Sequence, residues 1–361
     1  MKLLRVINSL AVGGAERSIV NNVPIHIANG LDMDVLLLDG RQTFFLDQLR
    51  QRDVKVTWLG RNINVYSPML VFKLLPIFKK YDVIHVHLFP ALYWVAFAKL
   101  LSWSRAKLIY TEHNTHNRRR GNPVYRWLDR LVYSQYSAII AISDATKLAL
   151  DRQTGTPGKS VVIPNGVQIA ELRESSAALP EGWESRIRGK KVLVQIAGFR
   201  PEKDQDTTIR ALTRLPADHV VIFVGDGERR LACEQLALEL GVGDRVFFAG
   251  LQREVAAFIK AADLVIMSSH WEGFGRTAVE GMALGKPVIA SNVGGLNEIV
   301  RGAGRLFEVG DFKALSEAVL ELLEQPSMYA EVAERCRARA EQYDVKYMIE
   351  GYERVYASVC N

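Results

Sequence analysis

Short apolar runs alternate with amphipathic segments along nearly the whole chain, and this alternation predicts its secondary structure. Apolar runs bounded by turn residues are typical of buried strands, and apolar positions three or four apart are typical of helices. In the first half we expect strands at 2–10, 35–38, 54–59, 83–88, 108–111 and 138–142, and helices at 15–28, 44–50 and 69–79. In the second half we expect strands at 192–197, 220–224, 246–249, 264–267, 287–290 and 305–309, helices from about 206, at 228–240 and at 255–262, and three closing helices at 312–324, 328–342 and 345–359.

Strands that alternate with helices predict an α/β fold with doubly wound, parallel sheets. Between residues 164–166 and 190–191 the pattern dissolves into a polar stretch, and there we place a boundary between two Rossmann-like domains, 1–168 and 169–344. Ligands of such sheets bind at the carboxyl ends of the strands. If the two halves face each other, these ends border a central cleft.

Composition excludes several classes of protein. The chain has 361 residues, of which 48% are hydrophobic and 24% are charged, as in an ordinary soluble globular protein. Its three cysteines, Cys233, Cys336 and Cys360, favour a reducing compartment over a disulfide framework or a zinc site. The longest apolar stretch, 90–103, is too short to span a bilayer, and we interpret the amino-terminal segment as a strand and not as a signal peptide.

Charge divides unevenly between the halves. Residues 1–170 contain 22 Lys and Arg against 11 Asp and Glu, whereas residues 171–361 contain 24 against 29. A basic half suggests a partner that carries phosphate, either nucleic acid or an anionic membrane surface. Residues 91–101 and 118–133 mix aromatic, apolar and basic side chains, so they fit a face that lies on a membrane or, equally, a core helix followed by a solvated basic loop. No recognised nucleic-acid motif accompanies them.

Candidate binding residues follow the expected strands. Arg200 and Lys203 come directly after one strand, at the start of a helix, where two cations are unfavourable for the helix dipole unless an anion joins them. We interpret them as a diphosphate clamp, in which Arg donates two hydrogen bonds and Lys acts as a point charge. The alternative is a pair of solvated surface cations.

Two carboxylates flank the glycine-containing turn 273–275. Glu272 and Glu280 are eight residues apart, which on a continuous helix would place them roughly 80° apart. Because the turn places Glu272 before the helix, both acids can point at one ligand, and carboxylates accept hydrogen bonds from sugar hydroxyls. The alternative is an N-cap acid followed by an ordinary glutamate on the helix surface. The turn and the helix N-terminus between them suit an anion.

Histidines and paired aspartates supply further candidates. His113 follows a strand at a carboxyl edge, where it can donate to a sugar hydroxyl, although His116 competes with it. His85 and His87 alternate within a buried strand and fit core histidines better than metal ligands. Two Asp-x-Asp triplets, 32–34 and 204–206, could hold a divalent metal, but their positions favour structural roles.

These motifs together resemble the family-4 retaining glycosyltransferases of the GT-B fold. The resemblance rests on EGFGRTAVE with its Glu-x7-Glu spacing, GFRPEKD, PNGV, VGDG, GGAER and GGLNEIV, which spread from residue 13 to residue 300. It implies that the first domain binds the acceptor and the second binds a nucleotide-sugar donor. It also implies that the last helix, within 345–361, completes the first domain.

The resemblance also implies a role for each matching residue. Arg200 and Lys203 would neutralise the donor diphosphate without a metal or other cofactor. Glu280 would bind the ribose of the donor, and Glu272 and His113 would contact the transferred sugar. The residues that match loops around the donor phosphates are Gly14, Gly275, Arg276 and Thr277. Arg276 and Thr277 depart from the pattern, because the family often has apolar residues there.

The implied reaction moves a sugar to a hydroxyl group with retention of anomeric configuration. A lipid-linked saccharide at the cytoplasmic face of the cell membrane, as in surface polysaccharide, lipopolysaccharide or capsule assembly, fits the basic first domain, and peripheral association with that membrane would follow. The competing interpretations are another nucleotide-sugar enzyme, such as an epimerase, and a non-catalytic protein that binds nucleotide-sugars. A nucleic-acid-binding protein would need base or phosphate contacts across the basic half.

Overall fold

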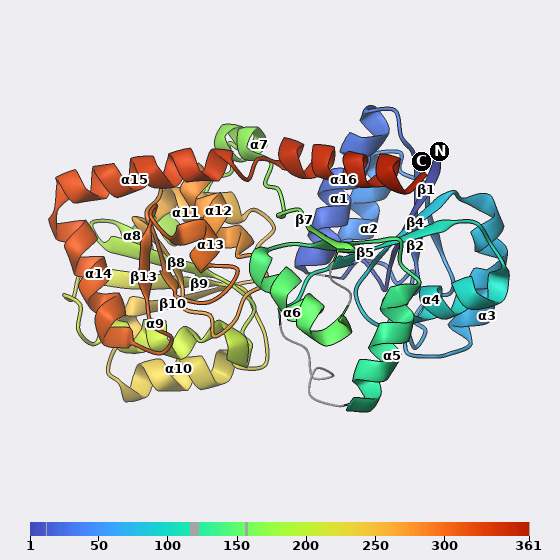
Figure 1. Cartoon of the computed structure of the whole chain (residues 1–361). Coiled ribbons are helices and arrows are strands. Elements are labelled where there is room, and N and C mark those ends of the chain that lie inside the picture. Colours follow the sequence, from blue (N-terminus) through green and yellow to red (C-terminus); the bar gives the residue numbers. More distant parts are fainter. Residues whose placement is uncertain (12, 116–122, 156–157, 361) are drawn as a thin grey trace. The chain divides into compact units, whose positions relative to one another are not determined.

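The computed structural model describes residues 1–361 apart from residues 12, 116–122, 156–157 and 361. The chain divides into two compact units. Unit 1 comprises residues 1–166 and 345–361, and unit 2 comprises residues 167–344. The division falls two residues before the boundary that we expected from the sequence. In Figure 1 the last helix (red) lies beside the first helix (blue), so the carboxyl-terminal segment packs in unit 1.

Unit 1 is built on a seven-stranded sheet in the order β3-β2-β1-β4-β5-β6-β7, in which all neighbouring strands are parallel. Its strands are β1 (Lys2–Ile7), β2 (Asp32–Leu37), β3 (Val56–Trp58), β4 (Val83–His87), β5 (Lys107–Glu112), β6 (Ala138–Ala141) and β7 (Ser160–Val162). Its helices are α1 (Gly14–Ala28), α2 (Phe44–Gln51), α3 (Leu70–Leu74), the 3-10 helix η1 (Leu75–Lys80), α4 (Ala91–Ser102), α5 (Pro123–Ser134), α6 (Asp144–Thr154) and α16 (Val345–Cys360).

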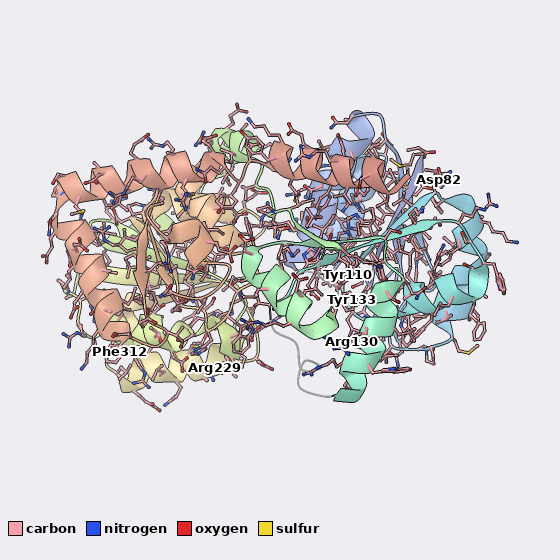
Figure 2. The ribbon with its side chains drawn as sticks, in the orientation of Figure 1. Asp82, Tyr110, Arg130, Tyr133, Arg229 and Phe312 are labelled. Carbon is pink, nitrogen blue, oxygen red and sulfur yellow. The ribbon has the colours of Figure 1, made fainter. Side chains whose placement is uncertain are left out.

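Both faces of this sheet are buried, which explains why its strands read as nearly continuous apolar runs. Successive residues of β1 alternate between two cores. Leu4 and Val6 pack in a core with α3, α4 and α5, whereas Leu3 packs on the other face with α1, α2 and α16. In the first core Tyr110 of β5 and Tyr133 of α5 meet edge to face, with ring centroids 5.7 Å apart (Figure 2). The helices thus hold the carboxyl ends of the strands in fixed positions.

Unit 2 repeats the architecture with a six-stranded parallel sheet in the order β10-β9-β8-β11-β12-β13. Its strands are β8 (Lys191–Ile196), β9 (His219–Val224), β10 (Val246–Gly250), β11 (Leu264–Met267), β12 (Val288–Ser291) and β13 (Arg305–Phe307). Its helices are α7 (Ile169–Glu174), α8 (Trp183–Ile187), η2 (Pro201–Lys203), α9 (Gln205–Leu212), α10 (Arg230–Glu239), η3 (Gly243–Arg245), α11 (Val255–Ala261), α12 (Arg276–Ala283), α13 (Asn297–Val300), α14 (Phe312–Glu324) and α15 (Pro326–Glu341).

The polar stretch near the boundary is more ordered than its sequence suggested. It contains two short helices, α7 and α8, that pack on unit 2. Nε of Arg173 donates to the carbonyl oxygen of Ala283 at 2.9 Å, and the ring of Trp183 lies edge to face with Phe258, with centroids 5.2 Å apart. Helices of six and five residues are too short to show a helical period, so tertiary contacts decide their conformation.

Further elements differ from expectation, among them the 11-residue helix α6, which was not predicted. The helix expected at 69–79 is split into α3 and the 3-10 helix η1, which has Pro76 at its start. Proline has no N–H for an α-helical hydrogen bond and clashes with the preceding turn, which explains the change. The three-residue edge strand β7 was not predicted, because so short a run shows no clear period.

Candidate functional site

In each sheet the strand order reverses once, and ligands of doubly wound sheets bind beside that reversal. In unit 2 the reversal lies between the neighbouring strands β8 and β11. The loop after β8 carries Arg200 and Lys203, and the loop after β11 carries Glu272. In unit 1 the reversal lies between β1 and β4, where Gly14 follows β1, and His113 follows the next strand, β5.

Lys203 and Glu272 form an ion pair across the reversal in unit 2, between Nζ of the lysine and Oε2 of the glutamate. Their side chains are 22% and 17% exposed, so the pair is partly open to solvent. Oε1 of Glu272 also accepts from the backbone N–H of Gly273 at 3.3 Å. Arg200 lies in the same loop as Lys203 but is exposed, and its guanidinium has no side-chain partner in the described part of the chain. The structure therefore joins Lys203 to Glu272 and leaves Arg200 facing solvent.

A buried polar network lies directly under these loops, and sequence reasoning missed it. Nε2 of Gln195 in β8 donates to the carbonyl oxygen of Lys203 at 2.9 Å. Oγ of Ser268, after β11, donates to the carbonyl oxygen of Asp204 at 2.6 Å, and Gln195 lies 3.0 Å from the same hydroxyl. Oγ1 of Thr208 donates to Oε1 of Gln195 at 2.7 Å. These bonds fix the backbone on which Lys203 stands. The available signal was Gln195, a polar residue within an apolar run.

The helix α12 begins directly after the turn that carries Glu272. Its N-cap, Gly275, has φ +80°, a conformation that suits glycine, and a Cβ at this position would lie 2.3 Å from Cδ2 of Leu296. Oγ1 of Thr277 lies 3.3 Å from the carbonyl oxygen of Ile196, which ties the start of the helix to the end of β8. N–H groups in the first turn lack partners within the helix, and with the helix dipole they favour an anion.

Glu280 is buried within α12, with only 4% of its surface exposed. Its Oε1 accepts a hydrogen bond from Nε of Arg276, one turn earlier, at 2.9 Å. Each acid of the motif is therefore matched with a cation, Glu272 with Lys203 and Glu280 with Arg276. The two pairs flank the start of α12, the position that an anion favours.

His113 is half-buried after β5, and its Nε2 lies 3.1 Å from Nδ1 of His87. Burial, and after it the positive charge of Arg5, lowers the pKa of His113 to about 4, so this imidazole is neutral at pH 7. Gly14 is the first residue of α1, and a Cβ there would meet no atom within 4 Å. His116, the competing histidine, lies outside the described residues.

The other sequence candidates for metal binding have structural partners. His85 and His87 are fully buried in β4, as we predicted for core histidines. Asp34 pairs with Lys55 at 2.9 Å, and Asp206 pairs with Arg229 at 2.7 Å, so each Asp-x-Asp triplet has a structural contact. Within the described residues, no group of three or more His, Cys, Asp or Glu side chains could hold a metal ion.

The two segments considered for a membrane face differ from each other. The helix α4 lies largely in the core, which favours the core-helix interpretation for it. The helix α5 is amphipathic: Val132 and Tyr133 are buried, whereas Tyr125, Trp127 and Leu131 are exposed. Among the helices that the structure describes, none is long and apolar enough to cross a membrane.

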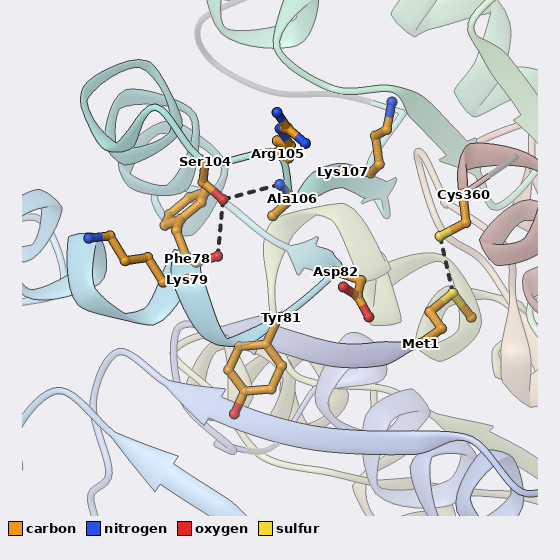
Figure 3. A pocket seen from close by; sticks show the side chains of 10 residues that line it. All are labelled: Met1, Phe78, Lys79, Tyr81, Asp82, Ser104, Arg105, Ala106, Lys107 and Cys360. Carbon is orange, nitrogen blue, oxygen red and sulfur yellow. Dashed lines mark hydrogen bonds between the residues drawn. The ribbon is translucent and has the colours of Figure 1, made fainter.

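A pocket of about 560 Å³ opens in unit 1 at the amino ends of the strands (Figure 3). Asp82, just before β4, and Lys107, the first residue of β5, lie in its wall, and Oδ2 of Asp82 accepts from the backbone N–H of Lys2 at 2.7 Å. His113 follows the other end of β5. The pocket therefore lies at the opposite edge of the sheet and is not part of the candidate site.

Comparison with known proteins places each unit in a family. Residues 12–171 match the family described as Glycosyltransferase Family 4, and residues 182–343 match the family described as Glycosyl transferases group 1. N-acetyl-alpha-D-glucosaminyl L-malate synthase of Bacillus anthracis is 28% identical over 288 residues, 77% of this chain and 75% of the relative. The lipopolysaccharide core biosynthesis glycosyltransferase LpsE of Rhizobium meliloti is 33% identical over 146 residues, 40% of this chain and 43% of the relative.

A solved structure extends the likeness over the full chain. The crystal structure of HepE from Anabaena in complex with UDP-glucose is 26% identical, with a TM-score of 0.87, and the match covers 99% of this chain and 100% of HepE. The fold and the two family matches together define a two-domain glycosyltransferase with the GT-B fold. The chain belongs to the glycosyltransferases that combine a Family 4 first domain with a group 1 second domain, and this confirms the family and fold class that its motifs predicted.

Proposed function

We propose that the protein transfers a sugar, with retention of anomeric configuration, from a nucleotide-diphosphate sugar to a hydroxyl group of a saccharide acceptor. The observation that carries this proposal is the Lys203–Glu272 pair at the reversal of strand order, beside the N-terminus of α12. A cation, an acid and a helix N-terminus converge there. This combination suits a ligand that carries both a diphosphate and sugar hydroxyls.

In this proposal unit 2 binds the donor. Lys203 exchanges its contact with Glu272 for the diphosphate, and Arg200, which is exposed in the same loop, adds a second positive charge. Backbone N–H groups of Gly275, Arg276 and Thr277 donate to phosphate oxygens. Glu280 accepts from the ribose hydroxyls. Likeness to HepE, whose structure holds UDP-glucose, supports a donor of this class.

The chemistry follows from the same charges. As the bond between the anomeric carbon and the diphosphate oxygen breaks, negative charge grows on the leaving group, and Arg200, Lys203 and the helix N-terminus stabilise it without a metal ion. The acceptor oxygen bonds to the same carbon from the same face. Glu272 and the neutral imidazole of His113 hold the transferred sugar by hydrogen bonds. Gly14, the first residue of α1, directly follows the loop of unit 1 that we assign to the phosphates.

We assign the acceptor to unit 1 and propose that it is a lipid-linked saccharide in the assembly of a surface polysaccharide. The similarity to LpsE, named for lipopolysaccharide core biosynthesis, supports this class of pathway. The exposed aromatic residues Tyr125 and Trp127 of α5, together with Arg126 and Arg130, suit the surface of an anionic membrane. The protein would then act as a peripheral protein at the inner face of the cell membrane.

The proposal is tested with the purified full chain and a panel of nucleotide-sugars. A true donor should raise the unfolding temperature, because a ligand that binds only the folded state stabilises it. With EDTA present and an acceptor saccharide added, NMR should show a product with the donor's anomeric configuration. An inverted product, or strict dependence on a metal, would contradict the mechanism. Turnover of the donor to another sugar-nucleotide in the absence of acceptor would indicate an epimerase instead.

A further inference from the structure

A buried arginine lies behind the candidate site in unit 1 and has no role in the chemistry described above. Arg5, in the middle of β1, has 0% of its surface exposed. Its Nε and Nη2 have no hydrogen-bond partner in the described part of the chain, and it forms no ion pair there. Its guanidinium lies over the rings of Tyr352 and Tyr356 of α16, at 4.9 and 5.8 Å from their centroids. Burying an unpaired charge is costly, so its position needs an explanation.

One polar contact of Arg5 leads to His113. Nη1 of Arg5 lies 3.1 Å from Nε2 of His87, the last residue of β4. Nδ1 of His87 lies 3.1 Å from Nε2 of His113. The imidazole rings of His87 and His113 are 5.4 Å apart. A continuous line of contacts therefore joins a fully buried cation to the histidine at the carboxyl edge of the sheet.

This line of contacts has only one consistent arrangement of protons for neutral histidines. A guanidinium donates hydrogen bonds and cannot accept them, so Nε2 of His87 must accept and carries no proton. A neutral imidazole has one N–H, which His87 must then carry on Nδ1 and donate to His113. Nε2 of His113 accepts this bond, so the proton of His113 lies on Nδ1. No hydrogen bond of this Nδ1 to another described residue is present.

The neighbouring histidine, His85, differs because its contacts select no tautomer. His85 contacts the hydroxyl of Tyr356 through Nδ1 at 2.8 Å and the hydroxyl of Thr111 through Nε2 at 2.7 Å. A hydroxyl can donate or accept, so neither contact selects a tautomer of His85. The charge of Arg5 also lowers the pKa of His85, His87 and His113, after the larger effect of burial, and this keeps all three neutral.

We propose that Arg5 and His87 are positioning residues that fix His113 as the neutral Nδ1–H tautomer, so that His113 presents a hydrogen-bond donor to the transferred sugar. The tautomer follows from the contacts within unit 1 alone. Its use toward a sugar rests on the proposed function. Arg5 touches no substrate in this scheme. Its guanidinium acts through the contact with His87, which selects the positions of the protons on His87 and His113.

The tautomer is tested by NMR on the full chain labelled with ¹⁵N in histidine. Two-bond ¹⁵N–¹H spectra distinguish a protonated ring nitrogen from a bare one, and a His113→Gln sample identifies the resonances of His113. We expect Nδ1 to be protonated and Nε2 to be bare from pH 8 down to pH 6. A proton on Nε2, or a doubly protonated ring at pH 7, would overturn the inference without any need for a variant of Arg5.

Two substitutions of Arg5 then test its part. Arg5→Lys keeps a donor-only cation and should retain the Nδ1–H tautomer, whereas Arg5→Met removes the donor and should give a mixture of tautomers. In the Met variant we expect the acid limb of the activity profile to move toward neutral pH. We also expect turnover to fall about three- to tenfold, because this fold-change corresponds to the free energy of one neutral hydrogen bond. An unchanged tautomer in a folded Met variant would contradict the role of Arg5.

The two proposals can fail separately. If NMR shows the expected tautomer but no sugar is transferred from any donor, the proposed function fails and the arrangement of Arg5, His87 and His113 stands. If sugar is transferred but His113 carries its proton on Nε2, the inference fails and the proposed function stands.

Discussion

The Lys203–Glu272 pair joins two loops that are 69 residues apart in sequence, and the proposed chemistry depends on it. In the structure each side chain neutralises the other. A diphosphate would replace Glu272 as the partner of Lys203 and release the carboxylate for a sugar hydroxyl. The pair therefore holds both groups in place before the donor arrives.

Replacement of Lys203 by alanine should reduce turnover about 10²- to 10³-fold, because one donor to the charge that develops on the leaving group is lost. Initial rates of nucleoside diphosphate release in the presence of acceptor measure the effect. Lys191→Ala is the matched control, since Lys191 is exposed at the opposite end of β8 and its loss should leave the rate unchanged. A Lys203→Ala variant with near wild-type turnover would remove the lysine from the mechanism.

Replacement of Glu280 by glutamine keeps the size of the side chain but removes the charge that accepts from ribose hydroxyls and from Arg276. Affinity for the nucleoside diphosphate should fall about tenfold or more, because hydrogen bonds to a charged acceptor are worth about 1.5–3 kcal/mol. Calorimetric titration measures it. Glu331→Gln in α15 removes a comparable acid, paired with Arg335 one turn away, and should leave the affinity unchanged. Equal affinities in all three proteins would exclude Glu280 from the site.

At the scale of residues, the sequence indicated the groups that stand in turns but not those beneath them. Arg200, Lys203 and Glu272 follow apolar runs, so their place at a carboxyl edge could be inferred before any contact was known. Gln195 and Arg5 lie inside apolar runs, where an isolated polar residue looks like an exception to the pattern. Their partners come from distant strands and helices, which pattern alone does not bring together.

At the scale of elements, the turn after β9 shows how closely two loops of the site approach each other. Gly225 has φ +143°, and a Cβ at this position would lie 2.1 Å from the carbonyl oxygen of Ala197, in the loop that leads to Arg200. Phe199 also accepts the backbone N–H of Arg229 at 3.1 Å. Absence of a side chain at Gly225 lets the two loops touch.

Gly225→Ala should therefore lower the free energy of unfolding by about 2 kcal/mol or more, since strained φ and steric overlap add. It should also weaken donor binding by displacing the loop of Arg200. Urea unfolding and calorimetry measure the two effects. Gly310→Ala provides the control: Gly310 has φ +78° but no atom within 4 Å of its Cβ position, so only the conformational cost remains. If both variants lost the same free energy of unfolding, the close approach of the two loops at Gly225 would make no contribution to stability.

Helix α5 is the element on which membrane association is expected to depend. Trp127 on its outer face is 68% exposed, close to two arginines of the same helix. Trp127→Ser should reduce flotation with vesicles that contain anionic lipid severalfold, and added salt should reduce it further. Trp103→Ser is the control, because Trp103 is 95% exposed but follows α4. Equal flotation of the wild type and the Trp127 variant would exclude this face.

Buried strands were predictable from sequence, but length alone did not make a helix predictable: the 11-residue helix α6 was not predicted. Strands such as β9 and β11 were placed within a residue or two, because buried parallel strands read as apolar runs. The short elements β7, α7 and α8 were not predicted, since three residues are fewer than two strand periods and five or six residues are fewer than two helical turns. Pro76 could have divided α3 from η1 in advance, because a proline inside a helical pattern usually ends it.

At the scale of the whole molecule, four buried or half-buried histidines make the stability of unit 1 sensitive to acid. Burial is the largest cause of the lowered pKa in each: to about 2 for His26, to about 4 for His113, and well below the ordinary value for His85 and His87. The folded state thus stays neutral at these positions while the unfolded chain takes up protons below about pH 6.5. The stability that these neutral histidines contribute is fully present above that pH and is lost progressively as the pH falls below it.

Each such histidine should lower the free energy of unfolding by about 1.4 kcal/mol per pH unit once the pH is well below 6.5. Urea unfolding at pH 7.5, 6.0 and 5.0 measures the loss, with the first unfolding transition assigned to unit 1 by the NMR signals of its histidines. His26→Gln should reduce the dependence of the free energy of unfolding on pH by the equivalent of about one proton taken up on unfolding. A free energy of unfolding that stays constant between pH 7.5 and pH 5.0 would contradict the neutral state of these groups.

For the chain as a whole, the repeated strand–helix pattern was enough to predict two doubly wound sheets. The place of α16 in unit 1 came only from resemblance to a family, because the helical period of its sequence is equally compatible with either unit. Contacts such as that between Nδ1 of His26 and Oε1 of Glu353, at 3.1 Å, decide the matter and join residues more than 300 positions apart. No local signal encodes such a pairing.

The return of α16 to unit 1 has a consequence for the order of folding during synthesis. Unit 2 is continuous, and the chain enters and leaves it at adjacent points, where the N–H of Val167 donates to the carbonyl oxygen of Tyr343 at 2.9 Å. Unit 1 lacks the rings that cover Arg5 until Tyr352 and Tyr356, which follow unit 2 in the chain, have left the ribosome. Domains commonly fold in order from the amino terminus. Here we expect the second unit to reach its native state first, because the first unit is complete only after α16, which follows the second unit in the chain, has been synthesised.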